Sequence, residues 1–182
     1  MDKAYKFRLY PNKKQEIQLA KTFGCARFIY NYYLANRIEL YKKDKQTMNY
    51  CSCSADLTNL KKQLPWLREV DKFALQNSIK DLDTAYQNFF RELKKNNKKQ
   101  GFPKFKSKHN HKQSYRTTFT NNNIEIKNGK IKLPKLDWVK IVISQNIQGR
   151  ILNCTVTKTK SGKYFVSVCC TDVKIKKYYK TD

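Results

Sequence analysis

The chain opens with an alternating pattern of apolar and polar residues. In KAYKFRLY, near the N-terminus, Tyr5, Phe7 and Leu9 fall on one face and polar side chains fall on the other. A period of two predicts a β-strand with one buried face. Pro11 interrupts a strand, and Asn12 is suited to capping a helix. We therefore expect one strand that is followed directly by a helix.

Residues 12–98 change to a helical pattern, with apolar positions spaced by threes and fours. A second helix is expected to begin at Ser52 or Ser54 and to end before Pro65. The third and longest helix is expected to begin near Asp71. One stripe of the first helix carries Cys25, Phe28, Ile29, Tyr32, Tyr33, Asn36, Leu40 and Tyr41. The third helix has an apolar stripe, for which core packing is the simplest explanation and which carries Leu75, Ile79, Leu82, Tyr86, Phe89 and Leu93.

From residue 115 onward the chain consists of short runs rich in β-branched and aromatic residues, which predict strands. Asn128-Gly129 and Ser161-Gly162 lie between such runs and predict hairpin turns. Antiparallel strands together with the N-terminal strand indicate an α+β protein, in which a small β-barrel is interrupted after its first strand by a helical block. The runs are SYRTTF, NIEI, KIKL, WVKIVI, LNCTVTKT and KYFVSVCC.

The balance of charge narrows the class of partner. The chain has 39 Lys and Arg residues against 14 Asp and Glu residues, which gives a formal net charge of +25. This excess indicates a nucleic acid, because each phosphate that a protein neutralises releases a condensed counterion. The alternatives are a basic surface that only aids solubility and an acidic membrane surface. No apolar run is long enough to span a bilayer, and no signal peptide is evident, so we expect a cytoplasmic protein.

The positive charge is densest between the helices and the strands. No acidic residue occurs between Glu92 and Glu125, and residues 94–116 contain nine Lys or Arg. Gly101 and Pro103 predict a loop here. A basic loop with spaced aromatic residues suits backbone contacts and base stacking, and a solvated linker is the alternative. The residues expected on a nucleic-acid backbone are Lys6, Arg8, Lys94, Lys95, Lys98, Lys99, Lys104, Lys106, Lys108 and Arg116.

The third predicted helix also has a polar face near its N-terminus, which carries Lys72, Gln76, Lys80 and Asp83. Helix N-termini attract phosphate, and Gln can pair with adenine in a major groove. Most polar helix faces are only solvated, so this pattern by itself does not establish a binding site.

The residue types that catalysis requires do not converge in this sequence. Asp137, Asp172 and Asp182 are isolated, no Gly-rich phosphate loop occurs, and the six cysteines form no C-x-x-C pair. We interpret the cysteines as reduced thiols of the core and the strands. The chain by itself is therefore expected to have no catalytic residue, no metal site and no enzymatic activity.

The order of these segments resembles the N-terminal half of TnpB, an insertion-sequence-encoded RNA-guided nuclease that is related to the type V CRISPR effectors. The segments span Lys3 to about Cys170 and are KAYKFRLYPNKKQ, FGCARFIYNYYLA, LPWLREVDKFALQNSIKDLDTAYQNFFR, GFPKFKSK, SYRTTF, IKLPKLDWVKI and TVTKTKSGKYFVSV. The resemblance implies an OB-like β-barrel, the wedge domain, over residues 1–11 and 114–182. It also implies an inserted helical recognition domain over residues 12–113.

The same resemblance implies guide RNA and double-stranded target DNA as partners, with protein side chains reading a short motif beside the target. The motif-reading positions that it implies are Tyr50, Ser54, Lys72, Phe73, Gln76 and Thr117 or Thr118. Among these, Lys72 and Gln76 coincide with the polar helix face noted above.

The family's catalytic carboxylates and zinc-ribbon cysteines belong to a RuvC-like half that this sequence does not contain, and Asp182 lacks the flanking G-I-D-x-G context. We therefore expect no cofactor in this chain, magnesium only in that nuclease half, and the nuclease half as a further partner. The alternatives are a helix-turn-helix-type DNA-binding repressor or transposition accessory protein, and a structural RNA-binding protein without DNA specificity.

Overall fold

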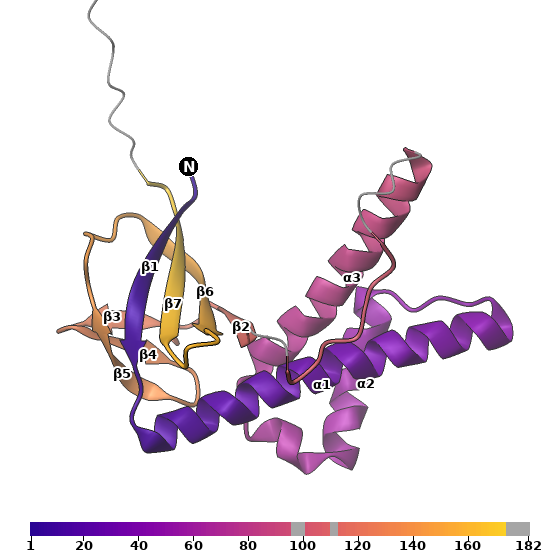
Figure 1. Cartoon of the computed structure of the whole chain (residues 1–182), viewed down its shortest axis with the longest axis horizontal. Coiled ribbons are helices and arrows are strands. Elements are labelled where there is room, and N and C mark those ends of the chain that lie inside the picture. Colours follow the sequence, from indigo (N-terminus) through magenta and orange to yellow (C-terminus); the bar gives the residue numbers. More distant parts are fainter. Residues whose placement is uncertain (96–100, 110–112, 174–182) are drawn as a thin grey trace, which may run out of the picture.

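A computed structural model describes residues 1–95, 101–109 and 113–173 of the chain (Figure 1). One strand, a block of helices and a set of strands follow one another, and the predicted α+β class is confirmed. The elements are β1 (Lys3–Tyr10), α1 (Lys13–Asp44), α2 (Tyr50–Gln63), the 3₁₀ helix η1 (Pro65–Arg68), α3 (Lys72–Lys94), β2 (Gln113–Thr118), β3 (Glu125–Lys127), β4 (Lys130–Leu133), β5 (Asp137–Val142), β6 (Arg150–Lys158) and β7 (Tyr164–Thr171).

The strands form one antiparallel sheet in the order β2-β6-β7-β1-β5-β4-β3. The N-terminal strand β1 lies in its middle, where Leu9 is paired with Tyr164 of β7 on one side and with Ile141 of β5 on the other. Strand β1 therefore joins two groups of strands that come from the far end of the sequence. Since β2 and β3 are edges in the described part of the chain, the sheet there is open and is not the closed barrel that the sequence suggested.

Both predicted hairpins are confirmed. Asn128 and Gly129 connect β3 to β4 with φ angles of +50° and +69°, the positive values that a type I′ turn requires. The second hairpin joins β6 to β7, where Gly162 has a φ of +75° and the Thr159 amide donates to the Lys163 carbonyl at 2.9 Å. These turns set the register of the strands that they connect.

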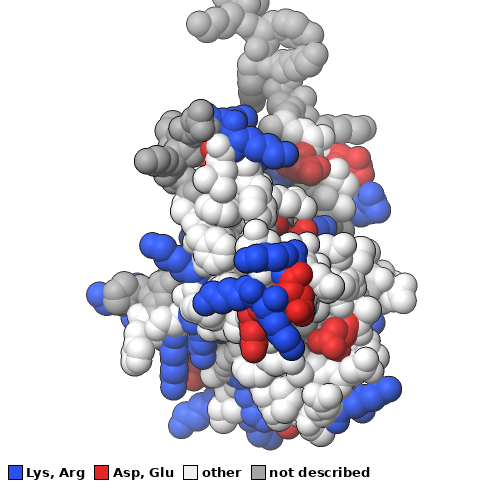
Figure 2. Space-filling model, turned by 90° about the vertical axis from the view of Figure 1, so that its right-hand side faces the viewer, with Lys and Arg blue, Asp and Glu red and all other residues white. Residues whose placement is uncertain are grey.

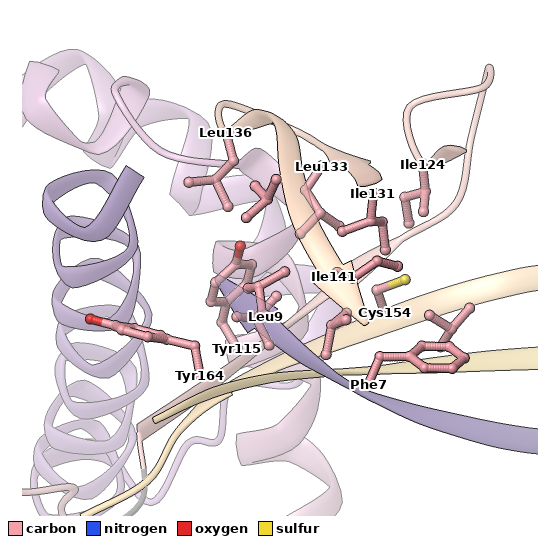
Figure 3. Close-up of a cluster of buried hydrophobic side chains, with 14 of the residues drawn as sticks. Phe7, Leu9, Tyr115, Ile124, Ile131, Leu133, Leu136, Ile141, Cys154 and Tyr164 are labelled. Carbon is pink, nitrogen blue, oxygen red and sulfur yellow. The ribbon is translucent and has the colours of Figure 1, made fainter. Parts of the chain in front are cut away.

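The main core is formed by buried side chains of the sheet, together with Leu19, Phe23 and Ala26 from the first half of α1 and Ala74 from α3. Tyr5, Phe7 and Leu9 are each 1% exposed, as their alternation predicted. Figure 3 shows Phe7 and Leu9 among buried side chains of the other strands. From α1, Phe23 meets the ring of Tyr115 edge-on at 5.6 Å between centroids, with Leu19 beside it in the same cluster. Helix α1 is thereby held against the sheet.

A second core joins the C-terminal half of α1 to α2, η1 and α3. The predicted α1 stripe is correct for Cys25, Ile29 and Tyr33. It is wrong at Tyr41, which is 53% exposed, because the last turns of α1 extend beyond the other helices (Figure 1). The stripe also missed the buried residues Tyr30, Leu34 and Arg37.

Two predictions about the helices need correction, one about where a helix begins and one about which helix is the longest. Helix α2 begins at Tyr50 and not at Ser52 or Ser54, because Asn49 is the N-cap and exchanges hydrogen bonds with Ser52 as a capping box. The longest described helix is α1, with 32 residues against 23 in α3. The end of the strand before Pro11, the cap at Asn12 and the start of α3 near Asp71 are confirmed; the structure adds that Asn12 and Gln15 form a capping box and that Asp71 is the N-cap of α3.

Candidate nucleic-acid interface

The first turns of α3 carry three of the predicted motif-reading residues. Asp71 fixes the start of the helix by accepting a hydrogen bond from the Phe73 amide at 3.0 Å. Lys72 is exposed, Phe73 and Gln76 are half-buried, and the Lys72 ammonium lies 5.0 Å from the centre of the Phe73 ring. The structure therefore places a cation, an aromatic ring and an amide next to one another.

A groove of about 480 Å³ adjoins this turn, and we call it the α3 groove. Residues from five separate parts of the chain line it, namely the end of α2, η1, the start of α3 and two turns of the sheet. Four of them are basic: Lys61, Arg68, Lys72 and Lys135. Asp71 also lines the groove, but its side chain is buried. Such a groove has the charge that a phosphate backbone requires.

The pKa of Lys61 reflects the excess of positive charge in the α3 groove. Burial lowers its pKa from the ordinary value, and the nearby Lys72 and Arg68 lower it further. The Asp71 carboxylate has only a smaller, opposing effect on that pKa. A bound anion would reduce the electrostatic repulsion between these cations.

The two threonines that were expected after the basic loop occupy different environments. Thr117 is fully buried and lies beside the Asp71 carboxyl. Thr118 is half-buried, and its hydroxyl accepts a hydrogen bond from the Asn77 amide at 3.2 Å. Asn77 also donates to the Arg116 carbonyl at 2.8 Å, so it fastens α3 to β2. Of the two threonines, Thr118 is the one that the fold leaves partly accessible.

Tyr50 and Ser54 lie in the first half of α2, at the end opposite to Lys61. At 1.5 Å per residue, Tyr50 is about 16 Å and Ser54 about 10 Å along the helix axis from Lys61. Tyr50 packs against the helical core, and Ser54 is half-buried. The structure does not bring either residue to the α3 groove.

The polar face predicted on the third helix is only partly a surface. Lys80 is exposed, but Asp83 accepts a hydrogen bond at 2.7 Å from the buried Arg37 of α1. Asp83 is therefore a structural partner of α1, and it does not belong with Lys72 and Gln76 in a binding face.

The basic loop is fastened to α1 and is not a free linker over its described residues 101–109. Asn31 of α1 donates to the Lys106 carbonyl at 2.9 Å and accepts from the Lys106 amide at 2.8 Å. The Lys106 ammonium lies 4.0 Å from the centre of the Tyr30 ring. Desolvation there lowers the pKa of Lys106, although the side chain as a whole stays exposed. The sequence contained no signal for the role of Asn31.

The other expected backbone contacts are distributed over the molecule. Lys94, Lys95, Lys104 and Lys108 are exposed, whereas Lys98 and Lys99 lie outside the described residues. Arg116 is paired with Asp81 at 2.8 Å. On β1, the Lys6 ammonium lies 4.8 Å and the Arg8 guanidinium 5.1 Å from the centre of the Phe165 ring. Lys6 and Arg8 therefore belong to the outer face of the sheet.

Figure 2 shows that Lys and Arg side chains are spread over the face that it displays, with acidic side chains among them. The positive charge therefore does not form one continuous patch on that face. The basic groove residues that sequence reasoning missed are Lys61, Arg68 and Lys135. They come from three segments, and no local pattern connects them.

The described residues contain no group of three or more His, Cys, Asp or Glu side chains that could hold a metal ion.

Cys25, Cys53, Cys154 and Cys170 are buried free thiols, in agreement with their interpretation as core residues. Burial raises the pKa of Cys154 above its ordinary value. None of the helices in the described part of the chain contains an apolar stretch that could span a lipid bilayer.

Residues 1–46 match a family model described as a helix-turn-helix domain. In the structure these residues form β1 and one continuous helix, α1, which extends to Asp44. The matched region therefore contains no pair of helices joined by a turn, and the helix-turn-helix geometry of the alternative interpretation is not present in it.

Three relatives are similar to this chain. A protein of Streptomyces pristinaespiralis, whose name assigns it to the RNA-guided DNA endonucleases, is 31% identical over 93% of this chain and 42% of its own length. InsQ of Escherichia coli K12, named in the same way, is 32% identical over 91% of this chain and 39% of its own length. The virulence protein VsdF of Salmonella dublin is 30% identical over 60% of this chain and 96% of its own length.

The chain spans about two fifths of the length of the two endonucleases that it matches. The match nevertheless extends over almost the whole of this chain, from the strand through the helical block to the sheet. The chain belongs to the TnpB family of insertion-sequence-encoded RNA-guided DNA endonucleases, of which it covers a part.

Proposed function

We propose that this chain is the guide-RNA-binding and target-DNA-binding part of a TnpB-like nuclease, and that the α3 groove holds the duplex that carries the target-adjacent motif. The observation that carries the proposal is the convergence of Lys61, Arg68, Lys72 and Lys135 on one groove at the start of α3. Phosphates bound by these cations would position the duplex. Gln76 and Phe73, on the same turns, would contact base edges.

We further propose that the helical block and the sheet are the recognition and wedge domains, with the boundaries expected from the sequence. Two separate buried clusters support this division, one centred on the sheet and one on the helices. Cleavage would require the RuvC-like half with its magnesium ions, and in this proposal the present chain supplies recognition alone.

Co-purification tests the first part of the proposal. The chain would be purified from its native host, and the bound nucleic acid would be sequenced before and after RNase treatment. We expect one RNA species derived from the end of the element, and DNA binding that is lost with the RNA. DNA binding that RNase leaves undiminished would contradict an RNA-guided role and would favour a DNA-binding repressor.

A selection from duplexes with a randomised flank tests the second part. Once the enriched motif is known, Gln76→Ala should lose about 1–3 kcal/mol of discrimination at one base pair. The matched control is Gln87→Ala, which removes the same side chain about three turns further along α3. Equal weakening of matched and mismatched duplexes by Gln76→Ala would show that Gln76 only positions the DNA.

A further inference from the structure

A second groove lies on the middle of α3, away from the helix start. Its volume is about 460 Å³, which is within the range of pockets that hold small ligands. Asp81, Thr84 and Asn88 line it from α3, and Gly101, Phe102 and Lys104 line it from the beginning of the basic loop. We infer that this groove binds one unstacked nucleotide of a single-stranded nucleic acid, an inference that rests on the proposed function.

Phe102 is the residue that a base would stack on. Its side chain is 44% exposed, yet its ring is held by two edge-on contacts, to Tyr86 at 5.5 Å and to Phe89 at 5.4 Å between centroids. An aromatic ring that is already fixed loses little conformational freedom when a ligand binds. Base stacking on an aromatic side chain tolerates every base, because every base has a π-face.

The loop residues that line the groove are held in place by contacts within the protein. Pro103 is buried, and Asn31 holds the backbone of Lys106 through two hydrogen bonds of 2.8 and 2.9 Å. In Figure 1 the loop runs beside α3 and then meets α1. These anchors hold the segment that carries Phe102 and Lys104 against the helices without a ligand.

The polar residues of the groove suit the rest of a nucleotide. The Lys104 ammonium is exposed and can neutralise a phosphate. Asn88 has an amide that can pair with a base edge. The Asp81 carboxylate would repel phosphate, but it accepts a 2.8 Å hydrogen bond from the Arg116 guanidinium, which balances its charge. The groove thus combines a stacking ring, a cation and an amide.

Bases inside a duplex are stacked on their neighbours and cannot lie flat on Phe102, whereas an unpaired base can be splayed out to do so. Single-stranded RNA and single-stranded DNA share this chemistry. The 2′-hydroxyl distinguishes them, so both are needed as probes.

The test compares a fluorescein-labelled 15-nucleotide single strand with an abasic strand of the same length and charge, in an RNA arm and a DNA arm. Phe102→Ala should weaken binding of the base-containing strand by about 5- to 150-fold and leave the abasic strand unaffected. Phe105→Ala is the matched control, because Phe105 is 58% exposed on the same loop and does not line the groove. Lys104→Gln should weaken both strands.

Phe102→Leu keeps an apolar contact to Tyr86 and Phe89 but removes the stacking face, so it should reproduce the effect of Phe102→Ala even if the alanine variant folds poorly. A larger loss in the RNA arm would assign the nucleotide to RNA, and a larger loss in the DNA arm would assign it to DNA. Equal losses for Phe102→Ala and Phe105→Ala, or losses that the abasic strand shares, would overturn this inference alone. A wild-type chain that binds none of the strands, nor duplex DNA, would overturn the proposed function as well.

Discussion

Asp71 carries both a local and a tertiary role. One carboxylate oxygen caps α3, whereas the other is buried without a hydrogen-bond partner in the described structure. Burial raises the pKa of Asp71 above its ordinary value of 3.8, and the Thr117 hydroxyl and the amides of Phe73 and Ala74 oppose this effect without cancelling it. Ionisation of Asp71 is therefore less favourable in the folded state than in the unfolded chain, although the side chain borders the groove where binding is proposed.

Asp71→Asn should raise the free energy of unfolding at pH 7. Asn is as good an N-cap as Asp, and it introduces no buried charge. Because the pKa is higher in the folded state, the carboxyl favours folding fully below its unfolded pKa, and this contribution is lost as the pH rises through the folded pKa. Denaturant melts should therefore show a gain at pH 7 that shrinks toward pH 4.

Asp71→Ala is the control for the capping role. It removes the buried charge as Asp71→Asn does, and it should be about 1 kcal/mol less stable than Asp71→Asn because no side-chain oxygen remains to accept from the Phe73 amide. A variant Asp71→Asn that is less stable than the wild type at pH 7 would contradict the account of a desolvated carboxylate.

Gly149 is required for the return of the chain into β6. It has a φ of +84°, and a Cβ atom there would collide with the Thr171 carbonyl oxygen of β7. Gly162 has a similar φ of +75°, but a Cβ atom there would meet no neighbour. Thermal melts should show that Gly162→Ala costs about 1–2 kcal/mol from backbone strain alone. Gly149→Ala should cost about 1–3 kcal/mol more, and equal costs would argue against the close approach.

At the scale of elements, α1 connects the two cores. Leu19 and Phe23 face the sheet, whereas Ile29 and Tyr33 lie in the helical cluster. The buried face thus rotates along the helix, which explains why a single stripe described α1 poorly.

The Arg37–Asp83 pair ties α1 to α3, with side chains that are 6% and 19% exposed. Arg37→Met alone should lower the free energy of unfolding by about 3–5 kcal/mol, because Asp83 is left as an uncompensated charge. The double variant Arg37→Met/Asp83→Leu should recover most of that loss. Chemical denaturation measures both variants.

The matched comparison is the Lys21–Glu69 pair, which also crosses between helical segments at 2.7 Å but has side chains that are 51% and 53% exposed. Breaking that pair should have a much smaller effect, since water screens exposed charges. A loss as large as that of Arg37→Met would contradict the distinction between buried and exposed pairs.

At the scale of the whole molecule, the net charge of +25 is divided among several sites. The α3 groove, the basic loop and the outer face of β1 each present cations that face away from the cores. A ligand that contacted all of them would have to wrap around the molecule, which a structured RNA together with a DNA duplex could do.

Salt titrations can count the contacts in the α3 groove. The logarithm of the association constant for duplex DNA should fall linearly with the logarithm of the salt concentration. Lys135→Gln should make this slope shallower by about 0.9 for the one phosphate contact removed. Lys160→Gln is the control, because Lys160 is an exposed lysine in the β6–β7 turn and does not line the groove. Equal changes in slope would mean that the groove has no special role.

The amino-acid sequence by itself determined those features that depend on near neighbours. The alternation of Tyr5, Phe7 and Leu9, the cap at Asn12, the helix start near Asp71 and the Asn128-Gly129 turn each involve residues a few positions apart, whose geometry is local. The helical and strand segments, the excess of cations and the adjacency of Lys72, Phe73 and Gln76 followed from the same kind of pattern.

Only the tertiary structure decided the pairing of distant segments. It placed β1 in the middle of the sheet, buried Thr117, and assigned Asn31 and Asn77 to hold the basic loop and β2. Lys61 and Lys135 are far apart in sequence, and they line one groove because the end of α2, the start of α3 and two turns of the sheet lie next to one another. Such contacts depend on how buried surfaces fit in three dimensions, which no local spacing of residues encodes.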